Sequence, residues 1–197
     1  DVLKEGSHFD LPIALALLVA MGIVTQEDAA EYTALGELGL DGRLARVAGV
    51  LPAAFDASAR GRGLICPEVS GSEAAWIDDI EILAPASLLA LVNHFKGLQI
   101  LTPPTPRLAN EETPLPDLID IKGQETAKRA LEVVAAGGHN LLMVGPPGAG
   151  KSMLARRLPG LLPPLTPGEA LEVSMIQSLA GGLTDGAISR RRPSPAS

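Results

Sequence analysis

The segment at residues 140–152 constrains the fold of this chain more than any other part of its sequence. The short apolar run NLLMV is followed by GPPGAGKS and then by the helix-compatible residues 153–158. Strand, glycine-rich loop and helix in this order are typical of a phosphate-binding loop, the P-loop. A glycine-rich turn that merely precedes a lysine is the weaker alternative, because the flanking elements also match. The sequence therefore predicts an α/β chain whose second half carries an anion-binding loop.

The residue types in this loop indicate which anion it binds. Glycines let the backbone wrap closely around phosphates with its N–H groups pointing inward, and the following helix presents its positive end to the same charge. We expect Lys151 to reach the β- and γ-phosphates and Ser152 to place its hydroxyl on Mg²⁺, so ATP and Mg²⁺ are the expected ligands. The candidate nucleotide site consists of Gly145, Pro146, Pro147, Gly148, Ala149, Gly150, Lys151 and Ser152.

A proline-rich segment divides the chain. Residues 99–116 show little apolar periodicity and contain Pro103, Pro104, Pro106, Pro114 and Pro116, as in an extended, partly stiff linker. We therefore expect a first domain at residues 1–98, a linker at 99–116 and a second domain at 117–197.

The first domain alternates helix and strand signals, which predicts a mixed α+β fold. Apolar periodicity, caps and turn residues favour a helix from the N-cap Asp10 to Met21, a hairpin of residues 33–40 and 44–47 around Asp41-Gly42, a helix at 52–59, strands at 64–66 and 80–83, and a helix from Ser87 to Phe95.

Composition excludes several classes of protein. Hydrophobic residues make up 46% of the chain and charged residues 20%, which is typical of a folded domain and not of a disordered chain. Cys66 is the single cysteine, so there is no disulfide framework; we expect a core thiol and a reducing cytoplasm. The longest apolar stretch, residues 11–24, contains Pro12 and Gly22 and is too short to cross a bilayer, so we expect no membrane partner.

Charge is unevenly distributed along the chain. Residues 1–98 hold 6 Lys and Arg against 14 Asp and Glu, a net charge of −8, whereas residues 99–197 hold 10 against 9, a net charge of +1. The acidic half is a poor surface for nucleic acid. The basic run Arg190, Arg191 and Arg192 lies in a half that has no aromatic residue for base stacking, so direct DNA binding by this chain is unsupported.

The sequence around the P-loop resembles a known family. The runs DIKGQE, KRALE and GGHNLLMVGPPGAGKSMLARRLPGLLPPLT are similar to the start of the AAA+ module of Mg-chelatase-like proteins, nearest the ComM/YifB group. In the first half, KEGSHFDLPIALALL and LGELGLDGRLARVAGVLPAAFDA resemble the Lon-protease-like domain that precedes the ATPase in that group. Together the two resemblances cover nearly all of residues 1–183.

The resemblance implies further site residues and partners. It places Ile121, Gly123 and Gln124 beside the adenine of bound ATP, and it implies a ring hexamer. The ComM group is associated with ATP-driven migration of DNA branch points during natural transformation, and the Lon-like first domain favours this role. A chelatase-type ATPase motor and a non-catalytic nucleotide-binding fragment are the alternatives.

Peptidase activity is disfavoured because the residues of the Lon dyad do not match. The resemblance puts His8 at the position of the catalytic serine, and residues 51–54 offer no lysine. Ser7 adjoins His8, and neighbours in sequence rarely reach the geometry that a nucleophile and its base require. We therefore expect a structural or docking domain.

ATP hydrolysis is not expected from the carboxylates of the second half. Phosphoryl transfer needs a carboxylate placed at the Mg²⁺ site, and none of Glu169, Glu172 and Asp185 follows an apolar strand. The family's sensor residues and arginine finger are not found. The ending RRRPSPAS departs from the continuation that the resemblance implies, and a frameshift or premature stop near Arg192 is our hypothesis, which an unbroken reading frame would refute.

Several polar residues of the second half have ordinary structural interpretations. Thr166 and Glu169 have the spacing of a capping box, so Glu169 is expected to start a helix and not to catalyse. Arg156 and Arg157 are expected on a solvated helix face, with a subunit contact as the alternative. His139 is assigned no metal role.

Overall fold

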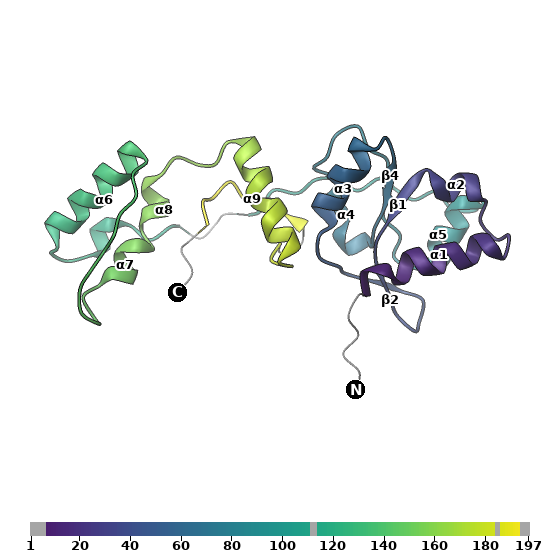
Figure 1. The fold of residues 1–197 in the computed structure, drawn as a ribbon, viewed down its shortest axis with the longest axis horizontal. Coiled ribbons are helices and arrows are strands. Elements are labelled where there is room, and N and C mark those ends of the chain that lie inside the picture. The colour runs from purple at the N-terminus through teal and green to yellow at the C-terminus, as the bar shows by residue number, and fades with distance from the viewer. Residues whose placement is uncertain (1–6, 111–113, 184–185, 194–197) are drawn as a thin grey trace. The chain divides into compact units, whose positions relative to one another are not determined.

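The computed structural model describes residues 7–110, 114–183 and 186–193 (Figure 1). Contacts divide these residues into two units. The first unit runs through Ala109 and includes Leu171–Ile188; the second consists of Asn110–Ala170 with the residues from Ser189 on. Residues 111–113, inside the predicted linker, and 194–197, inside the atypical ending, lie outside the described residues.

A three-stranded parallel sheet organises the first unit. Its order is β1 (Tyr32–Ala34), β4 (Gly63–Ile65) and β5 (Ile82–Leu83). Parallel neighbours need crossover connections, and β1 reaches β4 through α3 (Val50–Ala59). The first unit is thus built around a parallel sheet, which places it nearer to α/β than the α+β arrangement expected from the sequence.

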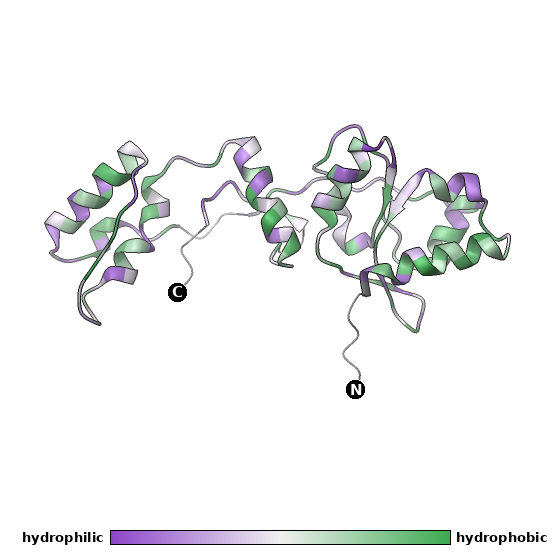
Figure 2. Ribbon diagram, in the orientation of Figure 1, coloured by the Kyte–Doolittle hydropathy of each residue, from purple (hydrophilic) through white to green (hydrophobic). Residues whose placement is uncertain are grey.

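Helices cover both faces of this sheet. Successive side chains of a strand point to opposite faces, so Leu64 and Cys66 join a cluster with α3 and α4 (Gly71–Ala74), whereas Ile65 joins α1 (Asp10–Ala20) and α5 (Leu88–Phe95). Figure 1 shows the two helix pairs on either side of β1 and β4. Figure 2 shows α1 as hydrophobic along its length, which agrees with its buried Leu11 and Leu15 and its exposed Ile13.

Cys66 is confirmed as a core thiol. It is fully buried, and burial raises the pKa of the thiol to about 12, with the charge of Glu73 adding to the shift. The thiol therefore stays protonated and inert at neutral pH.

The predicted strand at residues 33–40 is divided in two. Its first part is β1, and its second part, β2 (Glu37–Leu38), forms an antiparallel hairpin with β3 (Leu44–Ala45) around the predicted Asp41-Gly42 turn. The division falls at Gly36, whose N–H donates to the His8 carbonyl instead of continuing a ladder. A Cβ at Gly36 would lie 3.1 Å from Leu11, so the chain turns where α1 comes closest.

Two helices begin close to their predicted first residues. The helix predicted from Ser87 is α5, which has Ser87 as its N-cap, accepting the Ala90 N–H. At α1 the predicted N-cap Asp10 is wrong: Phe9 is the N-cap and Asp10 is the first helical residue. The Asp10 carboxylate instead accepts the Leu38 N–H at 3.4 Å, a contact with β2 that local sequence does not reveal.

Short elements complete the first unit. They are the 3₁₀ helices η1 (Ser7–Phe9) and η2 (Glu68–Ser70) and the helix α2 (Gln26–Ala30), which Thr25 caps by accepting the Asp28 N–H. None of the three was expected from periodicity, because each is shorter than two turns.

The second unit packs short helices around a small core. They are η3 (Leu118–Asp120), α6 (Glu125–Gly137), α7 (Lys151–Ala155) and α8 (Leu158–Leu161). Leu118, Ile121, Leu131 and Leu154 form its buried cluster. The helix α6 ends at the left-handed Gly138. None of the helices in the described part of the chain combines the length and hydrophobicity that a bilayer crossing requires.

The last turn of α9 (Pro167–Leu179), itself part of the first unit, contacts a buried carboxylate of that unit. Glu73 is 3% exposed and accepts hydrogen bonds from the Leu51 N–H, at 3.0 Å, and from the Ser178 hydroxyl of α9. The Ser178 carbonyl accepts the Gly49 N–H. One carboxylate therefore satisfies the amino end of α3 and the last turn of α9 together.

Replacing this carboxylate should destabilise the first unit. Glu73→Ala leaves a buried N–H and a buried hydroxyl without their acceptor, which costs about 2–4 kcal/mol of unfolding free energy, whereas Glu73→Gln, which keeps an oxygen acceptor, costs less. Urea unfolding measures the difference, with Glu172→Ala on the exposed face of α9 as the control. Equal stability of Glu73→Ala and the control would show that these hydrogen bonds contribute nothing.

Candidate functional site

The loop Gly145–Ser152 is closed around its own lysine. Lys151 Nζ donates to the carbonyl oxygens of Gly145 at 2.7 Å and Pro146 at 2.8 Å. Gly148 and Gly150 have φ values of +81° and +80°, a left-handed conformation that side chains with a Cβ rarely adopt. Gly148 and Gly150 are therefore required by the backbone of the loop.

Gln124 contacts the same loop from outside. Its side-chain amide donates to the Ala149 carbonyl at 3.3 Å, and a Cβ on Gly150 would lie 3.1 Å from that amide nitrogen. Gln124 itself has φ +57°, an unusual conformation for a residue other than glycine, and Gly123 before it has φ +70°. The structure thus brings Gln124, one of the three predicted adenine-side residues, into contact with the loop, and Gly123 precedes it in the chain.

Ile121, the third of these residues, has a different environment. It is 2% exposed and packs with Leu118, Leu131 and Leu154 in the core of the second unit. Its side chain therefore anchors the segment that leads to Gly123 and Gln124.

A cavity of about 550 Å³ opens along the loop. It is lined by Pro147, Gly148, Ala149, Gly150, Lys151, Ser152, Met153, Arg156 and Arg157. Three of these residues are cationic and none is acidic. A polyanion is therefore the ligand that this surface favours on electrostatic grounds.

The strand predicted at residues 140–144 is not formed. The segment is extended between α6 and α7 (Figure 1) but belongs to neither sheet. Met143 packs on the core of the second unit, whereas Leu142 and Val144 are 85% and 87% exposed. The alternation is that of a strand, but within the described ranges no second strand pairs with it, so no ladder exists.

Arg157 holds the helix after the loop in place. Its guanidinium donates to the Asp117 carbonyl at 2.8 Å and the Met153 carbonyl at 2.8 Å, and lies 3.8 Å from the Asp120 carboxylate. The side chain is only 13% exposed, so the expected solvated position is wrong for Arg157. The sequence gives no local signal for this contact, because the Asp117 acceptor is a backbone carbonyl and lies 40 residues away.

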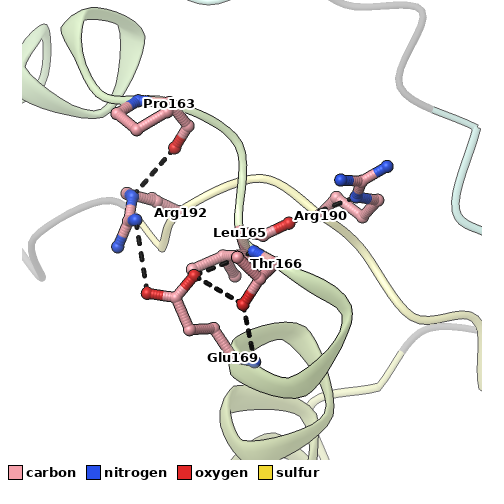
Figure 3. Close-up of polar contacts among 6 residues, drawn as sticks. All are labelled: Pro163, Leu165, Thr166, Glu169, Arg190 and Arg192. Atoms are coloured by element: carbon pink, nitrogen blue, oxygen red, sulfur yellow. Dashed lines mark hydrogen bonds and ion pairs between the residues drawn. The ribbon is translucent and has the colours of Figure 1, made fainter.

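Glu169 is a helix cap, as its spacing predicted. Its carboxylate accepts the Thr166 N–H at 2.8 Å and the Thr166 hydroxyl at 2.9 Å, while the Glu169 N–H donates to that hydroxyl (Figure 3). Arg192 approaches the same carboxylate at 3.5 Å and donates to the Pro163 carbonyl. The hydrogen bonds that start α9 therefore occupy the Glu169 carboxylate, so it is not free to act as a catalytic group.

Comparisons with known proteins identify relatives of both halves of the chain. The family model described as "Magnesium chelatase, subunit ChlI" matches residues 117–196, and that described as "Subunit ChlI of Mg-chelatase" matches residues 1–70. The uncharacterized protein YifB of Escherichia coli (strain K12) is 42% identical over 193 residues, which are 98% of this chain and 38% of YifB. The competence protein ComM of Haemophilus influenzae is 40% identical over 184 residues, 91% of this chain and 36% of ComM.

The chain belongs to the ChlI-like Mg-chelatase family, in its YifB and ComM group. An uncharacterized protein of Mycobacterium tuberculosis (strain ATCC 25618 / H37Rv) is also similar, at 41% identity over 92% of this chain. The chain spans 36% to 38% of the length of these relatives. The family resemblance inferred from the sequence is therefore confirmed in both halves of this ChlI-like chain.

The capping box of the ChlI-like chain should make its stability depend on pH. The Thr166 N–H, then the Thr166 hydroxyl, and then the charge of Arg192 lower the pKa of Glu169 below its ordinary 4.5. A carboxylate with a lowered folded pKa stabilises above its unfolded pKa, and this stabilisation is lost as the pH falls through the folded pKa.

We therefore expect Glu169→Gln to lower the melting temperature at pH 7 and to have less effect at about pH 3. Thermal unfolding of both proteins across this range measures the effect, with Glu172→Gln as the control. A melting-temperature difference that does not change with pH would contradict the assignment.

Proposed function

We propose that the loop Gly145–Ser152 of this ChlI-like chain holds the phosphates of ATP together with Mg²⁺. The observation that carries the proposal is the Lys151 ammonium, already bound by two loop carbonyls inside a cavity with cationic and no acidic lining. Left-handed glycines and a lysine of this kind suit an anion that approaches the backbone closely. The residues present therefore fit the ligand that the family implies.

Lys151, Ser152 and the residues on the base side have distinct roles in this proposal. Lys151 exchanges the Gly145 and Pro146 carbonyls for phosphate oxygens, which form the stronger, charge-assisted hydrogen bonds. Ser152 offers its hydroxyl to Mg²⁺, which neutralises phosphate charge when bound. On the base side, Gly123 and Gln124 are proposed contacts, and the buried Ile121 fixes their backbone in place.

From the positions of the described carboxylates we infer that the site binds ATP and does not hydrolyse it. Glu169 is engaged with Thr166 and Arg192, and Glu172 lies on an exposed face of α9. Asp185 lies outside the described residues. A base for the attacking water would have to be held beside the loop, and none of the residues lining the cavity is a carboxylate.

For the whole protein we propose an ATP-driven motor that acts on DNA. The support is the similarity to the competence protein ComM over 91% of this chain, including the first unit. A ring hexamer and branch-point migration belong to this proposal. The acidic first half, with a net charge of −8, is not the surface that would contact DNA. A chelatase-type motor is the alternative, and binding of the whole protein to branched DNA separates the two.

We propose that the first unit is a Lon-like domain without peptidase activity. His8, at the position of the Lon serine, lies in η1, where its carbonyl accepts the Gly36 N–H. At the position of the Lon lysine, Leu51 and Ala54 are fully buried in α3. Such a domain supplies a docking or positioning role instead of a nucleophile.

Lys151→Ala tests the proposed function. We expect the affinity for a fluorescent ATP analogue with Mg²⁺ to fall about a hundredfold, because a charge-assisted contact with phosphate is lost. Lys96→Ala, an exposed lysine of the first unit, is the matched control, and thermal unfolding shows whether each variant is folded. Wild-type chain that does not bind, or Lys151→Ala that binds as wild type, would refute the proposal.

Phosphate release measured in the same samples tests the inferred lack of turnover. We expect no release above that of Lys151→Ala. Release that depends on Lys151 would show that a carboxylate of this chain does act as the base.

A further inference from the structure

Arg156 lies one helical turn after the proposed Mg²⁺ ligand. The Arg156 N–H donates to the Ser152 carbonyl at 3.1 Å, so the two residues are i and i+4 neighbours on one helix face. Side chains of a helix lean toward its amino end, and a long side chain at i+4 therefore extends over residue i. Arg156 and Ser152 line the same cavity, in agreement with this direction.

The two arginines of the cavity differ in what holds them. Arg157 is bound by the Asp117 and Met153 carbonyls and lies near Asp120. Arg156 is exposed, and in the described ranges of the chain no hydrogen bond or ion pair engages its side chain. Arg157 is thus committed to the fold, whereas the charge of Arg156 is available to a ligand.

The lining of the cavity favours an anion as the partner of the Arg156 guanidinium. It contains Lys151 and Arg157 as further cations and no carboxylate. An arginine without an acidic neighbour in an anion-binding cavity favours a second phosphate oxygen, since its planar guanidinium can donate two hydrogen bonds to one phosphate.

We propose that Arg156 contacts the terminal phosphate of the bound nucleotide and gives the site its preference for a triphosphate over a diphosphate. The proposal rests on the proposed function. Lys151 would bind the β- and γ-phosphates, and Ser152, which would hold Mg²⁺, lines the same cavity as Arg156. Arg156, on the side of Ser152, adds a donor that only a nucleotide with a γ-phosphate engages.

The test compares two nucleotides on the full chain. Dissociation constants of the non-hydrolysable analogue AMP-PNP and of ADP, each with Mg²⁺, are measured for wild type, Arg156→Gln, Arg156→Lys and Arg62→Gln. Arg62→Gln removes an exposed arginine of the first unit and controls for net charge. Lys151→Ala reports separately on the loop itself.

We expect Arg156→Gln to weaken AMP-PNP about tenfold or more and ADP less than about threefold, with Arg62→Gln unchanged. Arg156→Lys should recover part of the loss, because it keeps the charge and loses the planar donor pair. Affinities of Arg156→Gln equal to wild type would overturn the proposal, as would equal losses for both nucleotides. Wild-type chain that binds neither nucleotide would refute the proposed function, and this inference with it.

Discussion

The contact of the Lys151 ammonium with the Gly145 and Pro146 carbonyls is the interaction on which the site depends. It ties the first turn of α7 to the start of the loop and thereby fixes the ring that the left-handed Gly148 and Gly150 complete. From outside, the Gln124 amide donates to the Ala149 carbonyl and limits how far the loop can open. When Lys151 exchanges these carbonyls for phosphate oxygens, the left-handed glycines and the Gln124 contact still hold the loop. The loop therefore loses little conformational entropy on binding, and more of the phosphate contact energy remains as affinity.

This loop is held mainly from its carboxyl side. Leu154 places α7 in the core with Leu131, and Arg157 attaches the same helix to Asp117. On the amino side, Met143 packs on that core, but the exposed Leu142 and Val144 have no neighbouring strand in the described part of the chain. An apolar strand without a ladder is marginal by itself. The P-loop is thus held by its helix and by Gln124 more than by the segment before it. The strand, loop and helix pattern of the sequence does not indicate this difference.

Local chemistry explains which features could be predicted from the sequence. The loop glycines, the start of a helix at Ser87 and the Thr166 and Glu169 capping box follow from backbone requirements within a few residues of each site. The division of residues 33–40 at Gly36 depends on contact with Leu11. The prediction of Asp10 as the N-cap of α1 was wrong because the Asp10 carboxylate contacts Leu38. Partners this distant in sequence leave no local signal. The same holds for the buried Glu73. Its contacts with Leu51 and Ser178 form only in the folded chain, so the local sequence does not distinguish it from an exposed acidic residue.

Amide hydrogen exchange tests most directly whether this preformed loop receives a nucleotide. Exchange is followed by mass spectrometry on the full chain with and without Mg²⁺ and AMP-PNP. We expect slower exchange in residues 145–154 and around Gln124, because the loop N–H groups become bonded to phosphates, and unchanged exchange in the sheet of the first unit. Exchange at residues 145–154 that does not respond to saturating nucleotide would contradict it.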